Sequence, residues 1–238
     1  MSVLLIEIGN TALKAAWADG NLLRKTMRYQ GEKIMDYIAT LLEKEKPDTL
    51  VMASVRDISP EDEAWIAGRC GQLVLIDRNH TAMLKAYGLP DYLTPDRGAS
   101  LIAVKNLFKN KDCVVFDFGT TLSIDFLAAD GTYEGGNISP GSRTRFKALN
   151  RYSRNLPLVN MPKTDKQYGT SLVSSIEAGV ISGIKFEIDG YIASKPESVV
   201  VFTGGDANYF AKQTSNSVFV VNNLVLMGLA VIAEDYDR

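Results

Sequence analysis

An internal repeat constrains the fold of this chain more than any other feature of its sequence. The apolar run at residues 3–6 leads into Glu7-Ile8-Gly9-Asn10-Thr11. The apolar run at residues 113–116 leads into Asp117-Phe118-Gly119-Thr120-Thr121, and position 117 follows position 7 by 110 residues. Both segments read acid, apolar, glycine, polar, threonine. Because a repeat of this length means that one structural unit is built twice, we expect two similar units.

Each copy continues in the same way. A second strand-like run follows at residues 13–17 and 123–127, and an Asp-Gly hairpin signal follows at residues 19–20 and 130–131. Helical and strand patterns then alternate, with helices expected at 34–44, 99–108, 170–192 and 224–234 and strands at 49–53, 73–76, 199–202 and 218–221. This order predicts a two-domain α/β fold with an N-terminal domain at residues 1–112 and a C-terminal domain at residues 113–238.

Charge and hydropathy exclude several classes of function. The 238 residues carry 26 Lys and Arg against 28 Asp and Glu, a formal net charge of −2, which gives little overall field for attracting nucleic acid or an anionic membrane. The longest apolar runs are strand-sized, far below the ~18 residues of a membrane helix. The N-terminus lacks a basic segment followed by an apolar one, so we expect no signal peptide and a cytoplasmic protein. Cys70 and Cys113 have no Cys-x-x-Cys spacing and are interpreted as reduced thiols.

The paired turns favour phosphate binding. Glycine allows backbone N–H groups to approach a phosphate, a hydroxyl donates to its oxygens, and a carboxylate at the strand end holds hydrated Mg²⁺. One such turn is weak evidence, because an acid before a turn glycine is usually only turn chemistry. Two copies at corresponding places predict Glu7 and Asp117 as metal ligands. The expected ATP and phosphate contacts are Gly9, Asn10, Thr11, Lys14, Gly119, Thr120, Thr121, Gly204 and Gly205. For Lys14 the alternative is a solvated side chain, and for Gly204-Gly205 it is a plain strand-to-helix turn.

The motifs occur together in an order that resembles a known family. They are Glu7-x-Gly9-Asn10-Thr11, Tyr87-x-x-Pro90-x-x-Leu93-x-x-Asp96-Arg97, Asp117-x-Gly119-Thr120, Gly135-Gly136-x-Ile138-x-Pro140-Gly141, Gly169-Thr170 and Thr203-Gly204-Gly205. Across nearly the whole chain this set resembles type III pantothenate kinase. The resemblance implies two duplicated actin-like (ribonuclease H-like) domains with a nucleotide cleft between them, the superfamily of acetate and sugar kinases, Hsp70 and actin. It also implies ATP-dependent phosphorylation of pantothenate to 4'-phosphopantothenate, the first step of coenzyme A biosynthesis, with Mg²⁺, a monovalent cation such as K⁺ or NH₄⁺, and a homodimer.

Two positions depart from the family's pattern. The family's first motif begins with Asp, whereas this chain has Glu7, which is one methylene longer. The family also has glycine where this chain has Thr94, followed by Pro95. We therefore expect the metal geometry at the first turn, and the backbone shape of the loop that carries Asp96, to differ from the family's.

The resemblance also implies the roles of individual residues. Asp96 becomes the base for the hydroxyl that is phosphorylated, although a helix N-cap is the alternative. Arg97 offers two parallel N–H donors to the substrate carboxylate, with a surface ion pair as the alternative. Tyr87 lines the substrate pocket or is a plain core aromatic. Thr170 contacts pantothenate bound by the partner subunit, caps the following helix, or does both.

Other sequence features leave alternatives open. Gly179 and Gly183 share a helix face, which places either the dimer axis or the interdomain seam there. Two alternative functions remain: a related small-molecule kinase or phosphohydrolase with another acceptor, or a nucleotide-binding regulator derived from such a kinase. The presence of Asp96, Arg97 and Asp117 together favours the enzyme, because a regulator has no need of all three.

Overall fold

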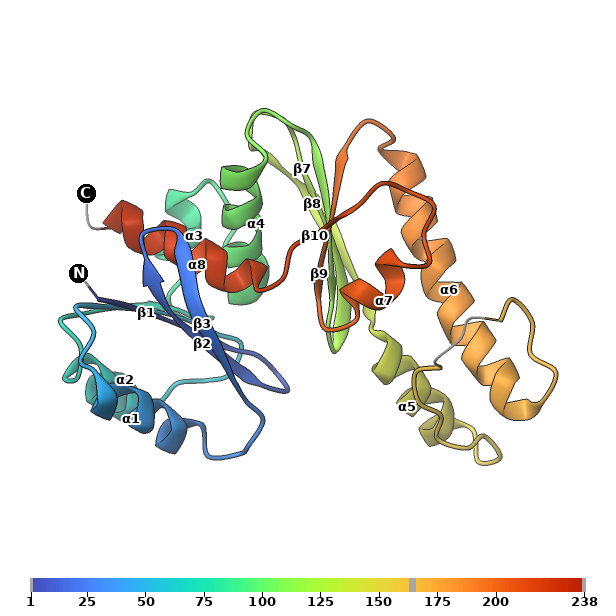
Figure 1. Ribbon diagram of the computed structural model, residues 1–238, viewed down its shortest axis with the longest axis horizontal. Helices are drawn as coiled ribbons and strands as arrows, with labels where there is room; N and C mark the ends of the chain where they lie inside the picture. The colour runs from blue at the N-terminus through green and yellow to red at the C-terminus, as the bar shows by residue number, and fades with distance from the viewer. Residues whose placement is uncertain (1, 163–165, 237–238) are drawn as a thin grey trace. The chain divides into compact units, whose positions relative to one another are not determined.

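The computed structural model describes residues 2–162 and 166–236. Contacts divide the chain into two compact units, which Figure 1 draws in colours that follow the sequence. Unit 1 comprises Met1–Lys109 and Asn223–Arg238, and unit 2 comprises Asn110–Asn222.

Unit 1 is built on a five-stranded mixed sheet. Its strands are β1 (Val3–Ile8), β2 (Leu13–Asp19), β3 (Leu22–Tyr29), β4 (Thr49–Ser54) and β5 (Gln72–Ile76), in the order β3-β2-β1-β4-β5. β1 pairs antiparallel with β2 and parallel with β4. The central strands are rich in branched apolar residues that are buried on both faces, as a parallel core requires.

Helices cover both faces of this sheet (Figure 1). The helices of unit 1 are α1 (Ile34–Lys44), α2 (Pro60–Ala67), α3 (Ala82–Ala86), α4 (Pro95–Leu107) and α8 (Leu224–Tyr236). The apolar stripe of α1, with Ile38, Leu41 and Leu42, packs with Ile66 of α2 into one core cluster with side chains of β1, β2 and β4. α4 and α8 pack closely on each other, and α8 also contacts β1 and β4.

Unit 2 has a second five-stranded sheet. Its strands are β6 (Cys113–Phe118), β7 (Thr121–Leu127), β8 (Tyr133–Pro140), β9 (Val199–Gly204) and β10 (Phe219–Val220), in the order β10-β9-β6-β7-β8. Its helices are α5 (Ser142–Tyr152), α6 (Leu172–Ser194) and α7 (Ala207–Ala211). Phe116, Phe118 and Phe202 pack edge-on or stacked among the isoleucines of α6, which forms the core of this unit.

The two sheets have the same topology. β6, β7, β8, β9 and β10 occupy the places of β1, β2, β3, β4 and β5, with the same parallel and antiparallel pairings. The prediction of a duplicated α/β unit is therefore confirmed.

The last helix lies in a different unit from the one that chain order suggests. A division of the chain into residues 1–112 and 113–238 places α8 in the second domain, whereas the structure places it in unit 1. The physical reason is burial: Leu226, Leu229 and Ile232 of α8 are almost fully buried, and Gly228 allows α8 to approach the backbone of α4. Unit 1 is thus formed by both ends of the chain.

Several elements carried too weak a periodic signal to be expected. β3 and β8 alternate only loosely and are largely exposed, because they are edge strands. α2 is short and acidic in its first turn, with a single buried residue, Ile66. Among the described residues, no helix is both long and apolar enough to cross a membrane.

Candidate active site

The first repeated motif forms a closed turn between β1 and β2 of unit 1. The N–H of Gly9 donates to the carbonyl of Ala12 at 2.9 Å, and a Cβ on Gly9 would lie only 3.3 Å from that same oxygen. The amide of Gly9 is therefore used within the turn. Asn10 and Thr11, both exposed, form its tip.

Glu7 lies beside this turn at the end of β1. The strand register pairs Glu7 with Lys14 of β2, and the Lys14 Nζ lies 3.2 Å from Oε2 and 3.5 Å from Oε1 of Glu7. Lys14 is thus held by a carboxylate rather than simply solvated. Burial raises the pKa of Glu7 above its ordinary value; Lys14 opposes this effect, and the negative charge of Asp96 adds to it.

Asp96 and Arg97 lie in the first turn of α4, in the same unit. The N-cap of α4 is Thr94, so Asp96 is not the N-cap residue, and its Oδ1 accepts the N–H of Arg97 at 2.9 Å. Asp96 is half-buried and close enough to Glu7 to shift the pKa of that carboxyl. Arg97 is 8% exposed. The tertiary fold therefore brings together two carboxylates that are far apart in the sequence.

The departure at Thr94-Pro95 does not distort this loop. Thr94 has φ −65° and ψ 149°, an extended conformation that any residue adopts, and Pro95 occupies the first turn of the helix, where its missing N–H costs nothing. α4 is then fixed by close contacts. A Cβ on Gly98 would lie 2.4 Å from a methyl group of Leu84.

The hydroxyl of Tyr87 is bound to the last helix. It donates to Oδ2 of Asp235 at 2.7 Å, and the carbonyl of Tyr87 accepts from Nζ of Lys105 at 2.7 Å. Burial and the Asp235 carboxylate both raise the pKa of Tyr87. The structure shows that Tyr87 links the segment before α4 to α8; its contact with substrate stays a prediction.

The second repeated motif forms the corresponding turn in unit 2. The N–H of Gly119 donates to the carbonyl of Thr121 at 2.9 Å, which closes the β6–β7 turn with Thr120 exposed at its tip. The start of α5 lies against this turn, because a Cβ on Gly141 would lie 2.2 Å from the Gly119 oxygen. Asp117, at the end of β6, is partly exposed beside the turn.

A third loop, at the end of β9 in unit 2, lies against the second turn. Gly204 has φ +92°, and a Cβ there would lie 2.4 Å from Oδ1 of Asp117, so only glycine fits. The N–H of Asp206 donates to the carbonyl of Phe118, and the Ser142 hydroxyl donates to the Asp206 carboxylate. In unit 2 the structure thus brings together Asp117, Gly119, Thr120, Gly204 and Gly205; their binding of a nucleotide stays a prediction.

Thr170 lies just before α6. The N-cap of α6 is Ser171, which forms a capping box with Ser174. The N–H of Thr170 donates to the Ser174 hydroxyl, and its side chain is exposed. The capping role proposed for Thr170 therefore belongs to its neighbour.

Sequence reasoning missed three polar residues that shape the turns: Arg56, Ser142 and Thr144. Each bonds either to a backbone carbonyl or to a side chain from a distant segment, and such contacts leave no periodic signal. The one sequence signal that could have identified any of them is the position of Ser142 directly after the Pro140-Gly141 motif.

The carboxylates fit a metal that arrives with a nucleotide. In residues 2–162 and 166–236, no three His, Cys, Asp or Glu side chains form a group that could hold a metal ion. Mg²⁺ needs only one or two carboxylates, since water and phosphate oxygens fill its other positions. Glu7 and Asp117 are hard oxygen donors of this kind.

Solved structures of other proteins share this two-unit α/β fold. A Campylobacter jejuni protein described as a candidate Baf family transcriptional activator has a similar structure, with a TM-score of 0.66 at 22% identity, covering 99% of this chain and 100% of that one. The activator of 2-hydroxyisocaproyl-CoA dehydratase from Clostridium difficile, solved with bound ADPNP, has a TM-score of 0.57 at 13% identity, covering 99% and 95%. At these identities the similarity shows the fold alone.

Sequence comparison identifies the family. The family model for type III pantothenate kinase matches residues 3–194. The type III pantothenate kinase of Phocaeicola vulgatus is 35% identical over 240 residues, covering 99% of both chains. That of Porphyromonas gingivalis strain W83 is 33% identical over 239 residues, covering 97% of both. This chain belongs to the type III pantothenate kinase family.

Proposed function

We propose that this protein transfers the γ-phosphate of ATP to the primary hydroxyl of pantothenate, giving 4'-phosphopantothenate and ADP, the first step of coenzyme A biosynthesis. The observation that carries the proposal is the placement of Asp96 beside Glu7, with Arg97 next to it in α4. A base, a metal-facing carboxylate and a carboxylate receptor are the groups that this reaction needs.

Asp96 is the proposed catalytic base. The pantothenate hydroxyl oxygen attacks the γ-phosphorus, the bond from the γ-phosphorus to the β–γ bridging oxygen breaks, and ADP leaves. The hydroxyl proton passes to the Asp96 carboxylate. Arg97 is buried, so its guanidinium is held in place for a bidentate bond to the substrate carboxylate. The ring of Tyr87 covers the apolar part of pantothenate.

The two turns are the proposed phosphate-binding elements. Asn10 and Thr11 in unit 1, and Thr120 and Thr121 in unit 2, are exposed at the tips of closed turns. We assign Gly204-Gly205 to the approach of the nucleoside, because these glycines lie directly beside Asp117 and the second turn.

Glu7 and Asp117 would hold Mg²⁺, and the reaction would also use a monovalent cation, K⁺ or NH₄⁺. When bound, these cations neutralise charge on the transferring phosphoryl group. Lys14 keeps the Glu7 carboxylate in place at the strand end and adds a positive charge near the phosphates.

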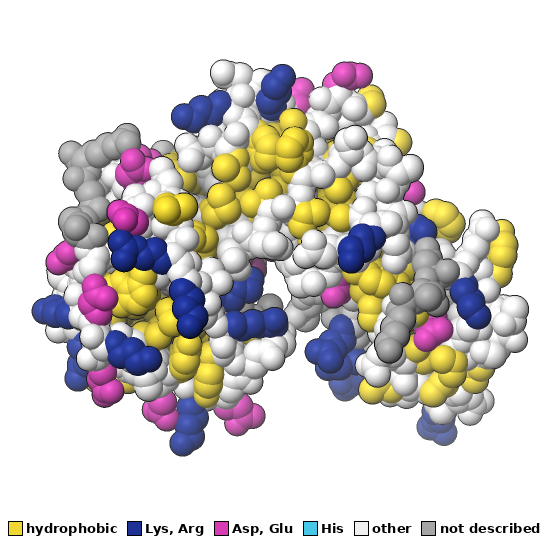
Figure 2. Space-filling model, in the orientation of Figure 1, with side chains coloured by type: hydrophobic (Ala, Val, Ile, Leu, Met, Phe, Trp, Pro, Cys, Tyr) yellow, Lys and Arg dark blue, Asp and Glu magenta, His cyan; other side chains and the backbone are white. Residues whose placement is uncertain are grey.

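We also propose a cytoplasmic homodimer in which Thr170 of one subunit completes the pantothenate pocket of the other. Leu172, Gly179 and Phe186 recur at intervals of seven along α6, so they share one face, and Phe186 is 71% exposed. A Cβ on Gly179 would meet nothing within 4 Å. Hydrophobic side chains are visible at the surface of unit 2 in Figure 2. This open face suits a second copy of α6.

The direct test is ADP release with and without pantothenate, in Mg²⁺ and K⁺. We expect ADP release to depend on pantothenate and mass spectrometry to show its phosphorylated product. ADP release that requires another alcohol instead, or that proceeds equally with water alone, would contradict the assigned acceptor.

A further inference from the structure

The side chain of Arg56, two residues after the end of β4, holds the first turn by bonding to the backbone of that turn. Its Nε donates to the carbonyl of Gly9 at 3.0 Å, and its Nη2 donates to the carbonyl of Asn10 at 2.8 Å. These charge-assisted bonds join segments 46 and 47 residues apart. One guanidinium thus fixes two successive peptide groups of the turn.

The backbone of Arg56 is itself held in place. The hydroxyl of the buried Ser54 donates to the Arg56 carbonyl at 2.7 Å, and the oxygen of the same hydroxyl accepts from the N–H of Arg56 at 3.1 Å. The N–H of Val55 donates to the carbonyl of Ile8 at 3.0 Å. The side chain therefore starts from a fixed strand end, so little backbone freedom is lost when it bonds the turn.

Holding the carbonyls also orients the amides. In a planar trans peptide the C=O and the N–H that follows point in opposite directions. When Arg56 draws the oxygens of Gly9 and Asn10 to its side, the N–H groups of Asn10 and Thr11 point to the other side. A flip of either peptide would turn an electron-rich oxygen toward a bound phosphate, and Arg56 opposes that flip.

Unit 2 restrains the corresponding turn with different residues. In the repeat, Thr120 corresponds to Asn10, and its carbonyl accepts from the N–H of Gly141 at 3.1 Å and from the Thr144 hydroxyl at 2.6 Å. The equivalent carbonyl is therefore bonded in both units, by a guanidinium in unit 1 and by an amide and a hydroxyl in unit 2. Because different residues bond this carbonyl in the two units, the turn requires the carbonyl to be held in place.

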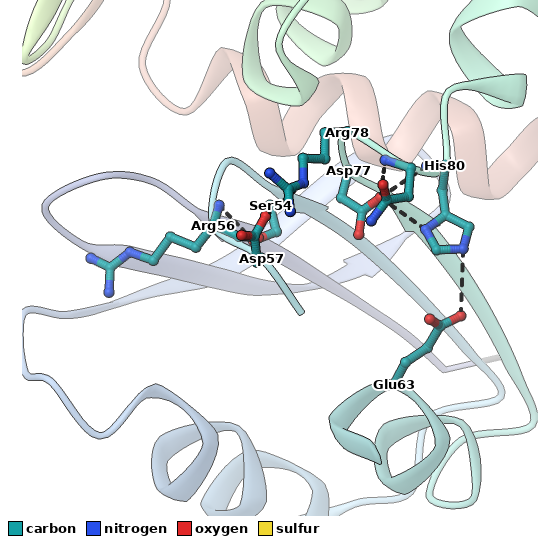
Figure 3. Close-up of polar contacts among 8 residues, drawn as sticks. Ser54, Arg56, Asp57, Glu63, Asp77, Arg78 and His80 are labelled. Atoms are coloured by element: carbon teal, nitrogen blue, oxygen red, sulfur yellow. Dashed lines mark hydrogen bonds and ion pairs between the residues drawn. The ribbon is translucent and has the colours of Figure 1, made fainter. Parts of the chain in front are cut away.

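The charged neighbours of Arg56 are paired among themselves. Arg78 and Asp57 form an ion pair at 2.8 Å, with side chains 72% and 66% exposed, and His80 Nδ1 lies 2.8 Å from the buried Asp77 carboxylate. Figure 3 shows the Arg56 guanidinium pointing away from these residues. Arg78 therefore serves as a matched control: an arginine of the same loop cluster that forms its ion pair with Asp57 and not with the turn.

We propose that Arg56 is a positioning residue for nucleotide binding, which orients the amides of the first turn toward the triphosphate of ATP. This inference rests on the proposed function, because it assigns a nucleotide to that turn. It predicts that substitution of Arg56 weakens the binding of ATP and leaves the binding of pantothenate unchanged.

The test compares Arg56→Ala, Arg56→Lys and the control Arg78→Ala with the unmodified protein. KM values for ATP and for pantothenate are measured by ADP release, and the affinity for ADPNP with Mg²⁺ is measured by calorimetry. For Arg56→Ala we expect the KM for ATP and the Kd for ADPNP to rise about tenfold or more, because two bonds from a charged donor are lost. In Arg56→Lys the ammonium group keeps the charge but cannot bond both carbonyls in the same geometry. Its KM for ATP and Kd for ADPNP should lie between those of the unmodified protein and those of Arg56→Ala. Arg78→Ala should stay within about twofold, since exposed ion pairs contribute little.

An unchanged KM for ATP in Arg56→Ala, or an equal rise in both KM values, would overturn the proposal. If Arg56→Ala does not accumulate as folded protein, Arg56→Lys decides, and unaltered ADPNP affinity in that variant refutes the role. Absence of pantothenate-dependent ADP release in the unmodified protein, with ADPNP affinity still lowered by Arg56→Ala, would refute the proposed acceptor and support the role of Arg56.

Discussion

At the scale of single residues, Asp96 is the most direct test of the chemistry. Asp96→Asn keeps the shape of the side chain but cannot take the hydroxyl proton, so we expect kcat to fall ~10²–10⁴-fold. Asp91→Asn is the matched control, because Asp91 is exposed and paired with Lys85 at 2.9 Å just before α4. The kcat of both variants is measured by ADP release. Near-normal kcat in Asp96→Asn would assign Asp96 to the structure of the helix start.

The two metal-facing carboxylates should respond differently to substitution. Asp117→Asn removes one of the few charges available to hold Mg²⁺, so the Mg²⁺ concentration for half-maximal activity should rise sharply. Glu7→Asp keeps the charge at the position where the family has Asp, so its effect should be mild. The two variants are compared by measuring their activity as a function of the Mg²⁺ concentration. Loss of activity in Glu7→Asp would mean that the site depends on the longer side chain and its pair with Lys14.

The cysteines should be inert in the folded protein. Burial raises the pKa of Cys113 to about 11, and burial also raises the pKa of Cys70. A raised thiol pKa means that the neutral, unreactive form persists until the pH passes through that value. We expect iodoacetamide at pH 8 to leave both unmodified in the native protein and to alkylate both in urea, as mass spectrometry can show. Equal rates in the two conditions would contradict this assignment.

At the scale of elements, the contact between α4 and α8 holds the ends of the chain in one unit. A Cβ on Gly228 would lie 1.8 Å from the backbone carbonyl oxygen of Ala99, which cannot move without shifting α4. We therefore expect Gly228→Ala to lower the free energy of unfolding of unit 1 by ~1–3 kcal/mol or more. Urea unfolding measures the change.

Gly68→Ala is the control for this prediction. A Cβ on Gly68 would make only ordinary contacts, 3.6 Å from the Ala64 oxygen, and its φ of −66° suits any residue. Its effect should be neutral or slightly stabilising. If both alanine variants unfold alike, close packing of α8 is not what holds unit 1 together. The same shift of α4 would move Asp96, so kcat should fall in Gly228→Ala and not in Gly68→Ala.

At the scale of the whole molecule, the proposed dimer makes assembly and substrate binding inseparable. Gly179→Leu adds a bulky side chain to the open face of α6 without a clash inside the chain, and it raises helix propensity. We expect it to separate the subunits and to raise the KM for pantothenate together. Sedimentation and activity are measured on one sample.

Glu61→Leu, on the exposed surface of α2, adds the same apolar group elsewhere and should change neither property. A monomeric Gly179→Leu variant with unchanged pantothenate affinity would place the whole pocket within one chain. Thr170 would then have no part in it.

Local sequence patterns determined the repeat and most of its elements. The apolar runs of β1 and β6, the strand-like runs of β2 and β7, and the Asp-Gly turns after β2 and β7 are short-range signals that the chain carries in order. The carboxylates and glycines of the turns could be assigned for the same reason, since each motif occupies a few consecutive positions. Asp96 and Arg97 were proposed as site residues through the order of motifs along the chain.

Tertiary structure alone decided the rest, because the decisive contacts join distant segments. α8 could not be assigned to unit 1 from its apolar pattern, which shows that a helix is buried but not against which sheet. Arg56 reaches a turn 46 to 47 residues away through backbone oxygens, which every residue possesses. Gly228 is needed only because α4 passes beside it. Periodicity is a property of neighbours in the chain, whereas close approach is a property of neighbours in space.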